Sequence, residues 1–376
     1  ESISVVSESS LNYRVSRMYD LRDGGDFAAL DLLYLMYGNY YNTESNTDGL
    51  RGTRVEDGDI VVSRSKEALL NHKYWYTDKT PDRPDLIDKQ WYWSENHILI
   101  FHTAEFLAGQ LFPNDVFPVT GLTGAQHMAR VRPLLIKWMD ERSRFGFNEW
   151  DSEVYYDLTS RPLLALVQFT VDDTELTQKS SMVLDLLFLD VGLHLHRGNF
   201  GATRGRSYAK SKFAASTADT FQWSQMLFEE SQLEYTAGRD EGVFFACADT
   251  YVLPHVIRTI AKSNETMIDK ERMNLPIPIE PDDSQSSAPY EFDFRDESDL
   301  SLWWSMSAMF SKRVLPLTIQ TANKYDLWNS QFKDYADELE VGGVGVDDLG
   351  LILIPIILAL YPSIWEVLNQ GILEEV

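Results

Sequence analysis

An acid, an amide and an imidazole stand side by side at Glu95, Asn96 and His97. An imidazole exchanges a proton near neutral pH, and a fixed amide can stabilise negative charge that develops during a reaction. Trp91 and Trp93 directly precede these polar residues, and the face of an indole ring suits the apolar face of a sugar. Together these residue types indicate a site that binds a sugar and moves a proton.

Each of these residues also has an ordinary structural explanation. A polar residue at the start of a helix is often a cap. Histidines on an apolar helix, such as His97 and His102, are often hydrogen-bonded core residues. The two tryptophans can equally be packing residues at a helix end. The residue types alone leave both interpretations open.

A second stretch, residues 145–157, is short, aromatic and acidic, and we expect it to link two helices. Glu149, Asp151 and Glu153 place three carboxylates within five positions. Such carboxylates repel one another unless they are solvated, bound to a cation or shifted in pKa. The aromatic residues among and after them are Trp150, Tyr155 and Tyr156. A solvated loop and a functional site are both consistent with this pattern.

A third stretch, residues 191–218, contains no acid and five basic residues, in a chain that is otherwise strongly acidic. A glycine-bearing basic loop after a helix can hold an anion. The preference of cations for a helix C-terminus accounts for Arg197 but not for Arg204, Arg206 and Tyr208. His194 and His196 lie two positions apart, which is the spacing of metal ligands on a strand rather than on a helix. No third ligand is evident, and we expect no metal site.

Composition excludes several classes of protein. The 376 residues include 33 Lys+Arg and 58 Asp+Glu, a net charge of −25, which argues against nucleic-acid partners and anionic membrane surfaces. The apolar fraction of 44% excludes a disordered chain. The single cysteine, Cys247, excludes an intrachain disulfide and a cysteine-based metal site. The longest apolar run, residues 351–360, is interrupted by Pro355 and is too short to span a membrane. We expect no membrane insertion and an extracellular or periplasmic location, and the absence of an initial Met suggests a processed or excerpted chain.

Helical periodicity dominates the sequence and predicts a single domain over residues 1–376. The expected helices are 27–41, 65–75, 91–110 with Ser94 as N-cap, 123–144, 163–169, 174–196, 213–230, 242–261, 300–309, 315–333 and 347–376. We expect the helix at 91–110 to be amphipathic. A short strand is expected at 60–62, a peripheral segment at 1–25, and a long loop or lid at 270–299. Long helices joined by short links that carry polar residues favour an all-α fold, an (α/α) toroid of antiparallel helix pairs.

Three segments within residues 60–260 resemble the α/α-toroid polysaccharide lyases, which include alginate lyases, hyaluronate and chondroitin lyases and the helical domain of heparinase-like enzymes. The segments are Asn96-His97 in the first turn of a helix, Tyr155-Tyr156, and the stretch with Arg204, Arg206 and Tyr208. The arginines and tyrosines lie further from the histidine than in alginate lyases. The acidic group at 149–153 is not required in those enzymes.

The resemblance implies β-elimination at a uronic acid of an acidic polysaccharide or oligosaccharide, without a cofactor. Such an enzyme removes the C5 proton after the adjacent carboxylate has been neutralised. The implied catalytic residues are Asn96, His97, Tyr155, Tyr156, Arg204 and Tyr208, and Glu149 of the acidic stretch is a further catalytic candidate. The amide and an arginine would stabilise the enolate-like intermediate, and a histidine or tyrosine would be the base. The candidate substrate-binding residues, chosen from their types and positions, are Trp91, Trp93, Glu95, His102, Trp150, Arg206 and Trp303.

Two alternatives use the same fold differently. An inverting glycoside hydrolase needs paired carboxylates, for which Glu95 and either Glu149 or Asp151 are candidates. A non-catalytic glycan-binding protein would need only the aromatic residues. Product chemistry separates the first from a lyase, because a lyase leaves an unsaturated sugar end.

Overall fold

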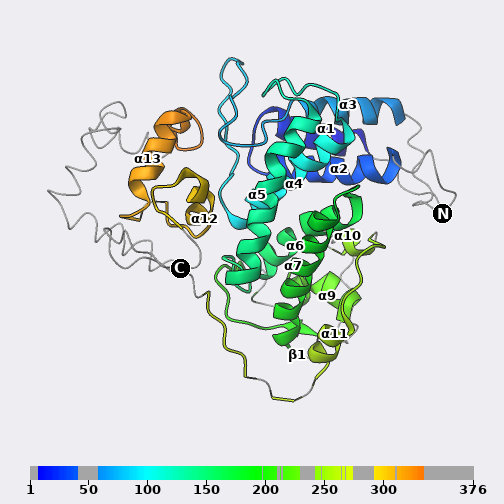
Figure 1. Ribbon diagram of the computed structural model, residues 1–376. Coiled ribbons are helices and arrows are strands. Elements are labelled where there is room, and N and C mark those ends of the chain that lie inside the picture. The colour runs from blue at the N-terminus through cyan, green and yellow to red at the C-terminus, as the bar shows by residue number, and fades with distance from the viewer. Residues whose placement is uncertain are drawn as a thin grey trace.

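The computed structural model describes residues 7–40, 58–196, 198–209, 212, 215–228, 242–246, 248–263, 265–266, 268–273, 292–309 and 311–333. Over these residues the protein is all-α, apart from one antiparallel pair of two-residue strands (Figure 1). The predicted fold class is therefore confirmed at the level of helix content. The expected helix at 347–376 lies outside the described residues, as does most of the expected lid at 270–299.

The first half of the chain contains the long helices: α1 (Glu8–Tyr19), α2 (Gly25–Tyr40), α3 (Gly58–Leu70), α4 (Glu95–Leu111), α5 (Gly124–Phe145), α6 (Glu153–Phe169) and α7 (Thr174–Leu193). The strands β1 (Leu195–His196) and β2 (Asn199–Phe200) follow α7. Shorter elements complete the described chain: η2 (Ala215–Thr217), α9 (Phe221–Phe228), α10 (Val243–Ala246), α11 (His255–Ala261), η3 (Glu297–Asp299), α12 (Leu300–Ser305), α13 (Leu315–Lys324) and η4 (Leu327–Asn329).

Helix α4 is the centre of the core. It packs against α2, α5 and α6, and every residue from 95 to 109 is buried. The expectation of an amphipathic helix is wrong, because neighbouring helices cover all of its faces. Its start is as expected, with Ser94 at the N-cap position, although the Ser94 side chain makes no capping hydrogen bond. The first-turn residues of α4 are consequently held in the interior.

Helices α4 and α5 approach closely through two glycines. A Cβ atom at Gly109 would lie 2.5 Å from the backbone oxygen of Gly124, and one at Gly124 would lie 2.6 Å from the backbone oxygen of Gly109. Real Cβ atoms do not approach backbone this closely, so both positions require glycine at this spacing. The start of α5 is fixed by Thr123 and Gln126, which form a capping box.

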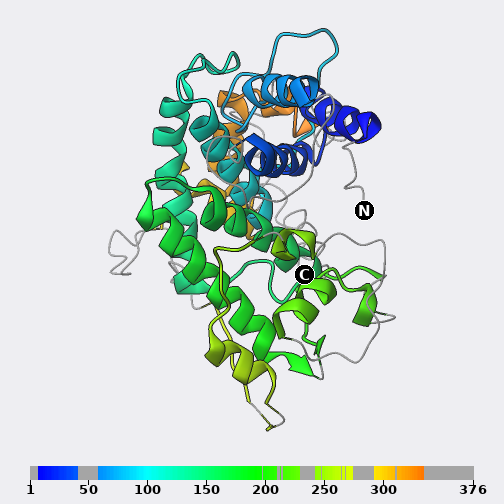
Figure 2. The same ribbon diagram turned by 90° about the vertical axis from the view of Figure 1, so that its right-hand side faces the viewer.

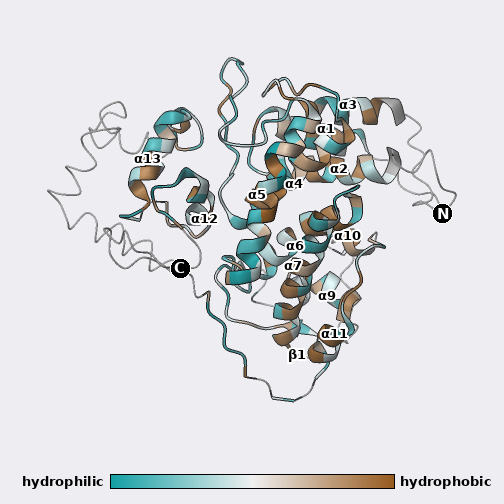
Figure 3. Ribbon diagram, viewed as in Figure 1, coloured by the Kyte–Doolittle hydropathy of each residue, from teal (hydrophilic) through white to brown (hydrophobic). Residues whose placement is uncertain are grey.

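Helices α6 and α7 form the second tight pair. Only residues 170–173 separate them, so they pack antiparallel, and Asp173 caps α7 by accepting from the backbone N–H of Leu176. Much of both helices is apolar (Figure 3), and Leu164 and Leu184 are among their fully buried residues. Helix α11 packs against α7 and α9, and α10 packs against α6 and α9 (Figure 2).

Several predicted boundaries need correction. Residues 60–62 belong to α3 and not to a strand, because Val61, Ser65 and Leu69 bury one face at helical spacing. Helix α3 ends at Leu70, and residues 71–75 continue without helix. The segment 1–25 contains α1, which packs on α2 and buries Leu11 and Met18.

The stretches that follow also differ from the expected ranges. Helix α6 begins at 153 and takes in part of the expected link, and α7 ends at 193. The stretches 213–230 and 242–261 hold the short helices α9, α10 and α11. Among the helices described here, none combines the length and apolar character needed to cross a membrane.

Candidate functional site

The first turn of α4 and the link before α6 meet at Asn96 and Glu149. The amide nitrogen Nδ2 of Asn96 donates to Oε1 of Glu149 at 2.6 Å and to Oγ of Ser94 at 3.1 Å. The Asn96 side chain is fully buried. Within the described part of the chain, Asn96 Oδ1 and Glu149 Oε2 are buried and have no hydrogen-bond partner. The cluster therefore holds two unpaired polar atoms inside the protein.

Glu95 fixes the position of Glu149. Its carboxylate accepts from the backbone N–H groups of Asn148 (2.8 Å) and Glu149 (3.0 Å), and forms an ion pair with Arg142 of α5. Glu95 and Arg142 are both buried. The predicted substrate-binding role of Glu95 finds no support in these contacts, because the carboxylate is already engaged inside the protein.

His97 is oriented by an acid from another helix. Its Nδ1 lies 2.7 Å from Oδ2 of Asp26, at the start of α2. Gly24 has a φ of 79°, and this left-handed conformation, which glycine adopts at little cost, directs the chain into α2. Burial alone would lower the pKa of His97, but the charge and the hydrogen bond of Asp26 raise it above its usual value.

A chain of hydroxyl and guanidinium groups lies beside Glu149. Arg206 Nη1 donates to Oη of Tyr155 at 2.9 Å, and Oη of Tyr155 lies 3.0 Å from Oη of Tyr208. Ser152 anchors the segment by donating to the backbone oxygen of Arg206 at 2.9 Å. Burial, together with the hydrogen bond to Tyr208, raises the pKa of Tyr155 above its usual value. Tyr208 is 43% exposed, so this chain connects a buried tyrosine with solvent.

Electrostatic interactions join the two groups of residues. Burial raises the pKa of Glu149 to about 7, while the Asn96 hydrogen bond and the charges of His97 and Arg206 oppose this rise. The charge of Glu149 in turn helps to raise the pKa of Tyr155. We refer to Asn96, His97, Glu149, Tyr155, Arg206 and Tyr208 as the amide–tyrosine cluster. It combines neutral donors, an acid that titrates near pH 7, and one cation.

Three of the predicted site residues make contacts elsewhere. Arg204 forms an ion pair with Glu153 at 2.8 Å, and Tyr156 Oη donates to Oδ2 of Asp190 at 2.8 Å. His102 is buried 4.4 Å from the Trp75 ring and lines a different cavity; burial lowers its pKa to about 3. The described contacts therefore do not bring these three residues into the cluster.

The predicted tryptophans fall into two groups. Trp93 and Trp303 are buried, where Trp93 packs on Trp304 and Trp303 stacks on Phe294. Trp91 is 40% exposed and Trp150 is 41% exposed. Only the two exposed rings of this set are accessible to a sugar.

A second cluster, of two acids and a histidine, adjoins Trp150, which donates to Asp151. Asp151, His194 and Glu271 each place one potential ligand atom within 4.8 Å of the others. Asp151 is buried, so the solvated-loop alternative does not hold for it, and burial raises its pKa to about 6. Burial, followed by hydrogen bonds with Asp269 and Asp190, raises the pKa of Glu271 to about 9. A cavity of about 460 Å³ borders this cluster and is lined in part by Trp150, Asp190 and Glu271.

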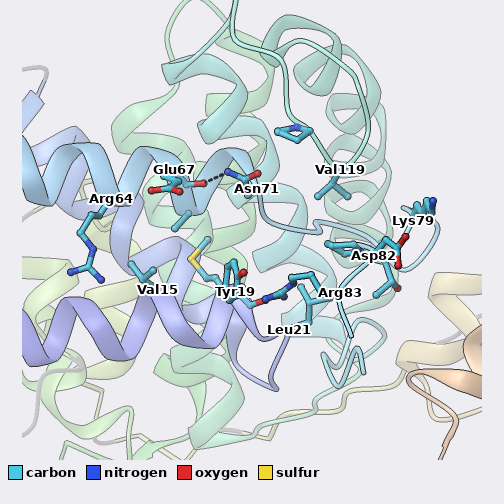
Figure 4. Close-up of a pocket in the computed structure, with 15 residues that line it drawn as sticks. Val15, Tyr19, Leu21, Arg64, Glu67, Asn71, Lys79, Asp82, Arg83 and Val119 are labelled. Carbon is cyan, nitrogen blue, oxygen red and sulfur yellow. Dashed lines mark hydrogen bonds between the residues drawn. The ribbon is translucent and has the colours of Figure 1, made fainter. Parts of the chain in front are cut away.

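Another cavity, of about 630 Å³, lies between α1, α3 and the segments at 79–83 and 118–119 (Figure 4). Its lining includes Arg64, Lys79 and Arg83, and the guanidinium of Arg83 lies over the Tyr19 ring at 3.6 Å. None of the residues singled out from the sequence lines it. The cavity is therefore separate from both clusters.

Sequence reasoning missed three residues that define these sites. Asp26 follows two glycines without any neighbouring motif, and Arg142 is one of several basic residues near the end of α5. Glu271 lies far along the chain from Asp151 and His194. Each acts through a tertiary contact, for which sequence spacing carries no signal.

No protein-family model, no curated protein and no solved structure matches this chain.

Proposed function

We propose that the chain is a carbohydrate-active enzyme that cleaves an acidic polysaccharide by β-elimination at a uronic acid. The observation that carries this proposal is the convergence of Asn96, Glu149 and the Arg206–Tyr155–Tyr208 hydrogen-bond chain. These groups come from α4, from the link before α6, from the first turn of α6 and from the segment after β2. Their types match the two tasks of the reaction, which are to neutralise a carboxylate and to move a proton.

The buried end of the cluster suits the substrate carboxylate. Glu149 has a pKa of about 7, so it carries a proton below that pH and can donate it in a hydrogen bond to a carboxylate. Asn96 holds Glu149 in place by donating to it, and His97, held by Asp26, adds a neutral or positive donor. A carboxylate held in this way withdraws charge from C5 and stabilises the enolate-like intermediate.

The exposed end suits proton transfer. Tyr208 is the most accessible hydroxyl of the cluster, and Tyr155 links it to Arg206. Tyr208 would act as the base, and Arg206 holds it in position through the hydrogen-bond chain with Tyr155. The protonated tyrosine would then return the proton to the leaving glycosidic oxygen.

The toroid arrangement is part of the same proposal. The antiparallel pairs α4/α5 and α6/α7 are the repeating unit that such a fold requires. An extracellular or periplasmic location is also proposed, because extended acidic polysaccharides are found outside the cytoplasm.

The hydrolase alternative rests on the raised pKa of Glu149, which suits a general acid. Its expected partner Glu95 is committed to Arg142 and to backbone N–H groups. Asp151 would have to supply the second carboxylate, and it belongs to the neighbouring acidic cluster. The contacts thus favour the lyase.

The test is incubation with a panel of polyuronates, glycosaminoglycans and neutral glycans, followed by ultraviolet absorbance and mass analysis of the products. We expect an unsaturated product from a uronate polymer. A saturated product that is lost in Glu149→Gln would assign the protein to the hydrolases. Binding without turnover of any glycan would leave the glycan-binding alternative.

A further inference from the structure

We propose that Asp151, His194 and Glu271 form a binding site for a divalent transition-metal ion, represented by Zn²⁺. The site goes beyond the proposed elimination reaction, which uses no metal. It departs from the expectation of no metal site, which considered His194 only together with His196. The ligands come from three segments: the link before α6, the C-cap position of α7, and the described residues 268–273.

Asp151 provides the observation that separates this site from a simple acidic cluster. Its side chain is buried, with 1% of its surface exposed, and Oδ2 accepts from Trp150 Nε1 at 2.6 Å. Oδ1 has no hydrogen-bond partner among the described residues and faces the His194 ring, 3.9 Å from Nδ1. An unpaired buried carboxylate oxygen is costly, and a cation in the space in front of it would remove that cost.

His194 is held in the orientation that metal-binding histidines adopt. Its Nδ1 donates to the backbone oxygen of Asp190 at 2.8 Å. The proton is thereby fixed on Nδ1, and Nε2 keeps a lone pair for a ligand bond. Nε2 lies 3.9 Å from Oδ2 of Asp269, which places a further carboxylate next to the site.

The spacing of the three ligand atoms fits one ion. One ring nitrogen of His194 and one oxygen of each carboxylate lie within 4.8 Å of one another. Zinc–oxygen and zinc–nitrogen bonds are about 2.1 Å long, so two ligands of one ion are at most about 4.2 Å apart. An inward movement of less than about 1 Å would close the site. The adjoining cavity of about 460 Å³ provides access for the ion and for a water molecule as fourth ligand.

The donor set selects the class of metal. One imidazole and two carboxylates suit zinc and similar first-row ions. Calcium and magnesium prefer oxygen ligands alone. Chelator-treated full-length protein should therefore bind one equivalent of Zn²⁺ in calorimetric titration, more tightly than Ca²⁺, at about 0.15 M salt to suppress diffuse binding to the acidic surface.

Three variants test the assignment. Asp151→Asn keeps an acceptor for Trp150, and Glu271→Gln changes a half-buried residue; each should weaken Zn²⁺ binding at least about tenfold. His196→Ala alters an exposed histidine two positions from His194 and should bind as wild type does. Circular dichroism checks folding, and if Asp151→Asn is misfolded the comparison rests on Glu271→Gln. Wild type that lacks a stoichiometric Zn²⁺ site, tighter binding of Ca²⁺ than of Zn²⁺, or unchanged affinity in folded variants would overturn the proposal.

Discussion

Glu149 is the residue whose protonation state matters most to the proposed reaction. Burial raises its pKa to about 7, so the carboxyl group is neutral below this pH and ionised above it. An ionised Glu149 would repel the carboxylate of the substrate. We therefore predict that kcat/KM on a uronate substrate falls as the pH rises through about 7.

The variant Glu149→Gln isolates this effect, because a glutamine amide stays neutral and still donates a hydrogen bond. We expect it to remove the descending limb of the kcat/KM profile. Glu67→Gln, at an exposed position on α3, is the matched control and should keep the limb. A limb that persists unchanged in Glu149→Gln would assign the titration to another group.

His72 provides a prediction for stability. It is buried, and burial lowers its pKa from 6.5 to about 4. As the pH falls below 6.5, the unfolded chain therefore takes up a proton that the folded chain does not. The contribution of His72 to the free energy of unfolding is present above pH 6.5 and is lost as the pH falls toward 4. The free energy of unfolding should decrease by about 3 kcal/mol from this residue between pH 7 and 4.

Denaturant titrations at several pH values measure this dependence. On acidification from pH 7 to 4, the free energy of unfolding of His72→Leu should fall by about 3 kcal/mol less than that of wild type. His255→Leu changes an exposed histidine on α11 and should lose as much as wild type. The same loss in all three proteins would show that His72 does not take part in acid destabilisation.

At the scale of elements, the α4–α5 contact depends on glycine. Gly124→Ala would place a Cβ within 2.6 Å of backbone oxygen, and the helices would have to separate. We predict a loss of about 1–3 kcal/mol of unfolding free energy. Gly38→Ala on α2 is the control, because its Cβ would meet no atom of the described chain within 4 Å. It should be neutral or stabilising by up to about 1 kcal/mol, and an equal loss in both variants would contradict the packing argument.

The Glu95–Arg142 ion pair joins α4, α5 and the link that carries Glu149. Removing one charge leaves the other buried and unpaired, which typically costs about 3–5 kcal/mol. We predict a loss of this size for Glu95→Gln in chemical denaturation, against almost none for Glu67→Gln. A Glu95→Gln protein of wild-type stability that lacks activity would instead favour the hydrolase assignment.

At the scale of the molecule, the sequence predicts helix content well because caps and periodicity are local. Thr123 and Asp173 mark helix starts that the structure confirms. Burial around the whole of α4 could not be predicted, because the covering helices come from distant parts of the chain. The convergence of Asn96 with Glu149, or of Asp151 with Glu271, depends on the same tertiary packing. Tertiary contacts also decide which arginine joins the cluster, because Arg206 bonds to Tyr155 whereas Arg204 pairs with Glu153.

The most direct measurement of the central claim is the rate of double-bond formation, followed by ultraviolet absorbance, on the best uronate substrate of the panel. We predict that Asn96→Ala and Tyr208→Phe each lower kcat at least about a hundredfold, because one stabilises developing charge and the other transfers the proton. Tyr13→Phe changes a tyrosine that is 56% exposed on α1 and should leave the rate unchanged. Wild-type rates in Asn96→Ala and Tyr208→Phe, or a product without the double bond, would contradict the account.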